Sequence, residues 1–208
     1  MGYRLHRSGT RRVNPLATAV IAGALLLVPS RMTRAVQTGT NAADAPAVDY
    51  LPDIPLVDQY GHNTTLASFK GKPALVGFIH TSCGGVCQML TAKMKSVADS
   101  VTPPFGAKLT MITITTDPKE DGPTQLTWYA KAQGATDPGW VFLTGKPENV
   151  ATVLRLYGVP DDPDDALTHV FELRLIGANG AQLKDYKGSN IKPSQVAADL
   201  RDVLAHRD

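Results

Sequence analysis

The only two cysteines of the chain, Cys83 and Cys87, are four residues apart. On one helical turn, side chains at this spacing are neighbours, with Cβ atoms about 5 to 6 Å apart. Two thiols that close can form a disulfide or donate two thiolates to one metal ion. The free N–H groups and positive dipole end of a helix N-terminus lower a thiol pKa, so we expect Cys83 to be the more thiolate-like of the pair. Gly84 and Gly85 between them leave no side chain to cover the sulfurs.

His169 is the candidate third ligand, because it begins a predicted strand whose start we expect beside the cysteine turn. Taken alone, a lone histidine is more often a hydrogen-bond partner of the backbone than a metal ligand. Two thiolates and one imidazole form a soft, three-coordinate site that suits Cu(I), and that holds Cu(II) when a water or carboxylate is added. Structural zinc usually takes four protein ligands, and only three are evident. His80, three residues before Cys83, is a further donor, but we interpret it as a strand-end histidine that contacts solvent.

The elements that must position these residues alternate between strand and helix. Residues 74–79 (ALVGFI) form a continuous apolar run that leads directly into the cysteine turn and then into a helix. Such a run has the length of a buried strand. Before this run, residues 56–66 form two short extended pieces that turn at Gly61. After it, the predicted strands are 109–115 and 140–143, followed by an antiparallel hairpin of 170–176 with 182–186. The other predicted helices are 124–133, 148–157 and 193–205. This order predicts an α/β fold of the thioredoxin-like sandwich class, with a central mixed sheet flanked by helices.

Several conspicuous side chains receive structural interpretations. Met89 and Met94 fit the core face of the helix after the cysteines, and Trp128 and Trp140 are interpreted as packing residues. Asp121 is predicted to cap the helix that follows it. The acidic run 161–165 (DDPDD) is interpreted as a solvated loop.

The N-terminal region differs in composition from the rest of the chain. Residues 1–34 hold six arginines and no acid, and residues 16–28 form an apolar run, which is the layout of a secretory signal. The sequence therefore predicts a signal peptide or signal anchor over 1–35, a flexible tether over 36–47 and one domain over 48–208. Four arginines precede the apolar run and two follow it, which places the domain outside the cytoplasm, in the periplasm, either secreted or anchored to the inner membrane.

Charge and cysteine content exclude several classes of protein. After residue 34 the chain has 15 basic and 19 acidic groups, a net charge of about −4, so we expect no nucleic-acid partner. Two cysteines exclude a disulfide scaffold and a four-cysteine zinc site.

The chain resembles the Sco/SenC family of copper-binding, thioredoxin-like proteins from about Asp53 to Leu204. Five motifs carry the resemblance. Two of them hold the candidate ligands: Cys83-x-x-x-Cys87 after a strand, and His169 ahead of a strand-turn-strand. The others are Thr113 to Asp121 (TITTDPKED) followed by Pro123, Leu126 and Tyr129; Phe142 to Gly145 (FLTG); and Tyr157 to Val159 (YGV). An ordinary thioredoxin has two residues between its cysteines, and this chain has the three of the family. One departure is that Gly84 and Gln88 stand where the family typically has prolines.

This resemblance implies that Cys83, Cys87 and His169 are the copper ligands, for Cu(I), Cu(II) or both. It also implies a chaperone that delivers copper to the CuA subunit of cytochrome c oxidase or to another copper protein.

An alternative is a dedicated thiol:disulfide oxidoreductase that reduces the cysteines of a copper site before metallation, with Cys83 as nucleophile, Cys87 as resolving thiol and a thioredoxin-like protein as reductant. A thiol peroxidase is disfavoured, because a peroxidatic cysteine typically needs a nearby threonine and arginine. No arginine lies between Arg34 and Arg155. A purely structural disulfide is also disfavoured, because closing so short a loop restricts the unfolded chain little.

Overall fold

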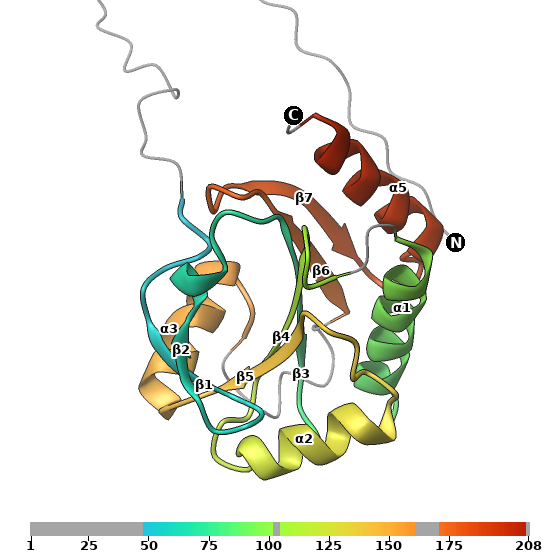
Figure 1. Ribbon diagram of the computed structural model, residues 1–208. Coiled ribbons are helices and arrows are strands. Elements are labelled where there is room, and N and C mark those ends of the chain that lie inside the picture. The colour runs from blue at the N-terminus through green and yellow to red at the C-terminus, as the bar shows by residue number, and fades with distance from the viewer. Residues whose placement is uncertain (1–47, 102–104, 161–170, 207–208) are drawn as a thin grey trace, which may run out of the picture. The chain divides into compact units, whose positions relative to one another are not determined.

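Three buried strands form the parallel middle of a mixed sheet in the computed structural model, which describes residues 48–101, 105–160 and 171–206 (Figure 1). They are β3 (Ala74–Ile79), β4 (Thr110–Thr115) and β5 (Trp140–Thr144). β4 pairs in parallel with β3 on one side and with β5 on the other. The apolar run 74–79 is thus confirmed as a buried strand with the predicted bounds.

Antiparallel strands complete the sheet at both edges. β1 (Pro55–Asp58) and β2 (Asn63–Thr65) form one edge, and β6 (Glu172–Ile176) and β7 (Gln182–Lys187) form the other. Among the described residues the strand order is β2-β1-β5-β4-β3-β6-β7. The turn between β1 and β2 contains Gly61 at φ 87°, as predicted for that position. The predicted hairpin is confirmed as β6 and β7, except that Val170, its first predicted residue, lies outside the described residues.

The helices begin and end close to the predicted positions. They are α1 (Val86–Ser100), α2 (Pro123–Ala132), α3 (Pro147–Tyr157) and α5 (Pro193–Ala205), with a short 3-10 helix, η2 (Leu66–Phe69), near the N-terminal edge. α2, α3 and α5 each have proline in the first turn, where its missing N–H breaks no helical bond. α3 ends at Gly158, which adopts the left-handed conformation at φ 67°.

Helices cover both faces of the sheet (Figure 1). Side chains alternate along β3, so Leu75 and Ile79 face one hydrophobic cluster while Val76 and Phe78 face the other. The first cluster is closed by α1, α2 and α5, and the second by α3. This arrangement confirms the predicted α/β sandwich, and it puts the start of α1, with both cysteines, on the face shared with α2 and α5.

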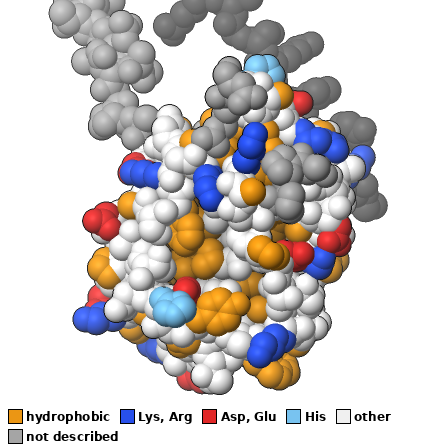
Figure 2. All heavy atoms as spheres, viewed as in Figure 1, with side chains coloured by type: hydrophobic (Ala, Val, Ile, Leu, Met, Phe, Trp, Pro, Cys, Tyr) orange, Lys and Arg blue, Asp and Glu red, His pale blue; other side chains and the backbone are white. Residues whose placement is uncertain are grey.

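Two packing predictions are wrong. Met94 is fully buried and Trp140 is 4% exposed, as expected, but Met89 is 45% exposed and Trp128 is 67% exposed. Large hydrophobic side chains therefore reach the surface among the charged ones (Figure 2). None of the helices that the structure describes is long and apolar enough to cross a membrane.

Candidate metal centre

The candidate centre is the turn between β3 and α1. β3 ends at Ile79, His80 follows it, and the backbone N–H of Cys83 donates to the carbonyl oxygen of His80 at 3.2 Å. α1 then begins at Val86, so Cys83 precedes the helix and Cys87 lies in its first turn, as predicted. Both thiols are free, and both side chains are buried.

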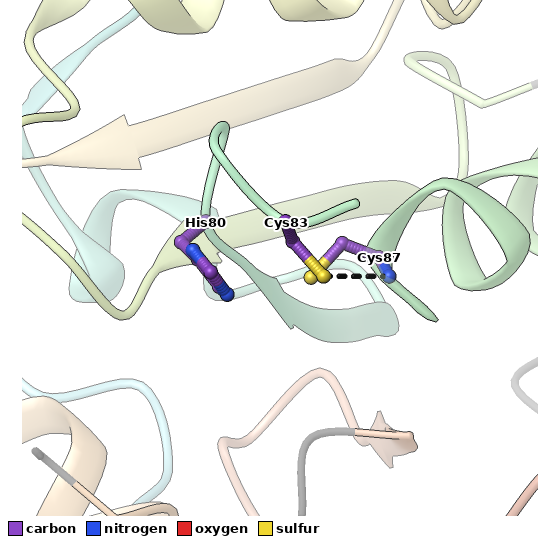
Figure 3. Close-up of side chains that lie close together, drawn as sticks. All are labelled: His80, Cys83 and Cys87. Carbon is purple, nitrogen blue, oxygen red and sulfur yellow. Dashed lines mark hydrogen bonds between the residues drawn. The ribbon is translucent and has the colours of Figure 1, made fainter. Parts of the chain in front are cut away.

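The sulfur of Cys83 occupies the position that a capping side chain usually takes. No side chain caps the N-terminus of α1 at Gly85, and the N–H of Cys87 instead donates to Cys83 Sγ at 3.3 Å (Figure 3). The N–H groups of Gly85 and Val86 point at the same sulfur. The first N–H groups of a helix have no partner inside the helix, so a partly negative sulfur at this place satisfies several of them.

The two thiols differ in acidity. Burial disfavours the Cys83 thiolate, but hydrogen bonds from the Cys87 thiol and from the three backbone N–H groups outweigh it and hold the pKa of Cys83 below its ordinary value. Burial raises the pKa of Cys87 to about 12, and its bond to Cys83 acts in the same direction. Cys83 is therefore the more thiolate-like of the pair, which agrees with the prediction from the sequence.

This asymmetry predicts selective alkylation. At pH 7, iodoacetamide should modify Cys83 of the reduced, metal-free chain at least about tenfold faster than Cys87, because the thiolate is the nucleophile. The exposed fractions of the two side chains, 5% and 4%, are nearly equal, so access does not account for a difference. Peptide mapping by mass spectrometry over time gives both rates. Equal rates would contradict the assigned acidity.

Asp121, in the loop between β4 and α2, anchors the cysteine turn. Its carboxylate, on a residue only 1% exposed, accepts hydrogen bonds from the Thr81 N–H at 2.9 Å, from Thr81 Oγ1, and from Thr115 Oγ1 at 2.6 Å. The capping prediction for Asp121 is wrong, because Gly122 is the N-cap of α2 and the carboxylate points to the cysteine turn instead. The parallel pairing of β3 with β4 carried the signal for this contact, since it brings the carboxyl ends of both strands to the same edge.

His80 lies with the cysteines. One of its ring nitrogens and the two sulfurs all lie within 4.8 Å of one another, and Figure 3 shows the ring beside the sulfurs. The histidine is 7% exposed, so the prediction that it contacts solvent is wrong. Nδ1 lies 3.1 Å from Ser82 Oγ, while Nε2 is buried and has no hydrogen-bond partner among the described residues. Its place three residues before Cys83 was the only signal of this proximity in the sequence.

His169 and the acidic run 161–165 lie outside the described residues, so the predicted ligand set stays a prediction. The described part of the site supplies two sulfurs and one imidazole, the donor types that bind Cu(I). The same two thiols lie within 4.8 Å of each other, which is the arrangement of a pair that can exchange with a disulfide. Behind them, the hydroxyl of the buried Tyr129 bonds Thr91 Oγ1 at 2.9 Å.

Comparisons with known proteins place the chain in a family. The model of the family described as SCO1/SenC matches residues 43–205. The SCO1 protein homolog of Bacillus subtilis is 29% identical over 152 residues, which cover 70% of this chain and 78% of that protein.

Two solved structures extend the comparison. The copper-bound structure of ScoI from Bradyrhizobium japonicum is similar with a TM-score of 0.62 and 29% identity, covering 74% of this chain and 99% of that one. BsSco, described as a member of the Sco family of cytochrome c oxidase assembly proteins with a disulfide switch, is similar with a TM-score of 0.60 and 26% identity, covering 77% and 96%. The chain therefore belongs to the SCO1/SenC family and has the thioredoxin-like fold of its members.

Proposed function

We propose that this protein is a copper chaperone that binds one copper ion through Cys83, Cys87 and His169 and delivers it to the CuA site of cytochrome c oxidase or to another copper protein. The observation that carries the proposal is the pair of buried cysteine sulfurs that lie within 4.8 Å of each other and of a ring nitrogen of His80. Membership of the SCO1/SenC family and the copper-bound relative support copper as the cargo.

The turn is built for exchange of its cargo. Gly84 and Gly85 are exposed, and a Cβ on either would meet no atom within 4 Å. An incoming thiolate of the recipient can therefore approach the site over the glycines. Val86 and Met89, both exposed apolar residues of the first turn of α1, offer a contact surface beside Cys87. Transfer then proceeds by ligand exchange, in which each new bond from the recipient to Cu(I) replaces one bond to this protein.

The second candidate function is reduction of the recipient's disulfide before copper arrives. The low pKa of Cys83 favours it as the attacking thiolate, with Cys87 as the thiol that resolves the mixed disulfide. The disulfide switch described for BsSco supports this candidate. In the balanced step the two thiols lose two electrons and become a disulfide, and the recipient's disulfide becomes two thiols. A thioredoxin-like reductant would then restore the pair.

Location and domain organisation are part of the same proposal. We infer a signal peptide or signal anchor over 1–35, a tether over 36–47 and the copper-handling domain over 48–208. The arginine-rich start and the apolar run support export to the periplasm, with the domain secreted or held at the inner membrane.

Replacing His169 by alanine tests the ligand set and separates the two functions. If His169 is a ligand, H169A should lower the Cu(I) affinity at least about tenfold, because losing even a hydrogen-bond partner of a metal ligand costs about 10- to 100-fold. The substitution should also change the Cu(II) absorption spectrum. Disulfide exchange with a small disulfide should stay nearly unchanged, because it needs only the two thiols. Competition with a chromogenic Cu(I) chelator measures the first effect, and thiol release measures the second. An H169A variant with full affinity and an unchanged spectrum would remove His169 from the site.

A further inference from the structure

We propose that Nε2 of His80 is a metal ligand, and that His80, Cys83 and Cys87 form a Cu(I) site contained within residues 80–87. The inference depends on the proposed copper-binding function and adds to it a ligand that belongs to the cysteine turn itself. His169, the ligand proposed from the resemblance, would bind the same ion in addition to these three.

The missing hydrogen bond of the His80 ring indicates that His80 coordinates a metal ion. Nε2 has almost no exposed surface and no hydrogen-bond partner among the described residues, although nearly all buried polar atoms in folded proteins have one. One ring nitrogen of His80 lies within 4.8 Å of both sulfurs, and an imidazole nitrogen beside two sulfurs is the donor set that a soft metal ion uses. A bound ion would give this nitrogen the partner it lacks.

Ser82 fixes the orientation of the ring. Its Oγ lies 3.1 Å from Nδ1 of His80. When Nδ1 carries the proton and donates to this oxygen, Nε2 holds the lone pair needed for a metal bond. Histidines that bind metals usually make such a second hydrogen bond through the other ring nitrogen. Ser82 is therefore the positioning residue of the His80 ligand.

The backbone around His80 is held in place before any metal binds. The carbonyl oxygen of His80 accepts from the N–H of Cys83 at 3.2 Å, which closes the turn between the two ligands. The next residue, Thr81, donates its N–H to the buried carboxylate of Asp121. These bonds hold the backbone of the turn in place, so little backbone entropy is lost on binding.

The distances suit a three-coordinate ion. Bonds of about 2.3 Å to sulfur and about 2.0 Å to nitrogen put the three ligand atoms of one ion about 3.7 to 4.0 Å apart. One ring nitrogen of His80 and the two sulfurs lie within 4.8 Å of one another, so small side-chain rotations are enough to bring Nε2 and the sulfurs to bonding distance. Two thiolates, one neutral imidazole and Cu(I) give the site a net charge of −1.

The test compares full-length reduced chains in an H169A background, where the site of residues 80–87 would act alone. Cu(I) affinity is measured anaerobically by competition with a chromogenic chelator for the wild type, H169A and H169A/H80F. Phenylalanine keeps the ring volume and removes both nitrogens. H169A/H80F should bind Cu(I) at least tenfold more weakly than H169A, and X-ray absorption of copper-loaded H169A should show one nitrogen beside two sulfurs.

Two controls separate a ligand from a structural residue. Because Nε2 has no hydrogen-bond partner among the described residues and only the bond of Nδ1 to the exposed Ser82 is lost, H80F should change the urea midpoint of the metal-free chain little. A structural role instead predicts a clearly lower midpoint and unchanged copper affinity. H62A is the matched histidine control, since the His62 side chain is 74% exposed and pairs with Asp58. It should leave the copper affinity at the wild-type value.

The outcomes also distinguish this inference from the function on which it depends. Equal Cu(I) affinity of H169A and H169A/H80F would overturn the His80 ligand while leaving the chaperone in place. A wild-type chain that does not compete with the chelator would overturn both.

Discussion

Replacing Cys87 by serine should lower the Cu(I) affinity of the full chain at least about 1,000-fold, or about 4 kcal/mol. Serine keeps nearly the same shape, but its hydroxyl is a poor ligand for a soft ion, so the ion loses one of its two thiolates. C83S should have an effect of similar size, because both sulfurs belong to the same three-atom cluster. Chelator competition on the reduced proteins measures the loss.

The matched control for the cysteine variants is Gln88→Ala. Gln88 is exposed and follows Cys87 directly on α1, so its replacement tests whether any change in that turn weakens binding. Q88A should bind copper as the wild type does. Cysteine variants that keep the wild-type stoichiometry and affinity would rule out the chaperone function.

Replacing Asp121 by alanine should reduce the free energy of unfolding by about 3 kcal/mol. The change leaves Thr81 N–H, Thr81 Oγ1 and Thr115 Oγ1 without their shared acceptor in a site that water barely reaches. It also frees the cysteine turn from β4, so Cu(I) binding should weaken as well. Urea unfolding followed by circular dichroism measures the first effect.

Asp117→Ala is the control on the same loop. The Asp117 carboxylate accepts only from the Glu120 N–H, at 3.4 Å, among the interactions found for its oxygens in the described residues. Its removal should change the unfolding free energy by less than about 0.5 kcal/mol. Equal destabilisation of D121A and D117A would contradict the anchoring role of Asp121.

The helices and strands were predictable because residues such as proline and glycine mark where they begin and end. The strand 74–79 has Pro73 before it and the cysteine turn after it, and α5 begins at Pro193, so both elements have the predicted bounds. Helical faces were harder to predict. The buried face of α1 consists of Cys87, Leu90, Thr91, Met94 and Val97. Because Thr91 is polar, a search for hydrophobic residues at helical spacing does not identify this buried stripe correctly. Met89 lies outside the stripe and is exposed.

The site was partly predictable for a related reason. The spacing of Cys83 and Cys87 and the start of a helix between them follow from local sequence, and so does the greater acidity of Cys83. No local pattern in the sequence specifies that His80, directly after β3, is buried. The role of Asp121 depends on a contact across 40 residues. This contact follows from the parallel pairing of β3 with β4, which brings the carboxyl ends of both strands to the same edge of the sheet.

The most direct test of the central claim is an anaerobic Cu(I) titration of the reduced full-length protein against a chromogenic chelator. We predict that the protein withdraws one Cu(I) per chain from the chelator complex, with a sharp end point at that ratio. A titration in which the chelator keeps all of its copper would contradict the chaperone function and leave a dithiol whose chemistry is disulfide exchange.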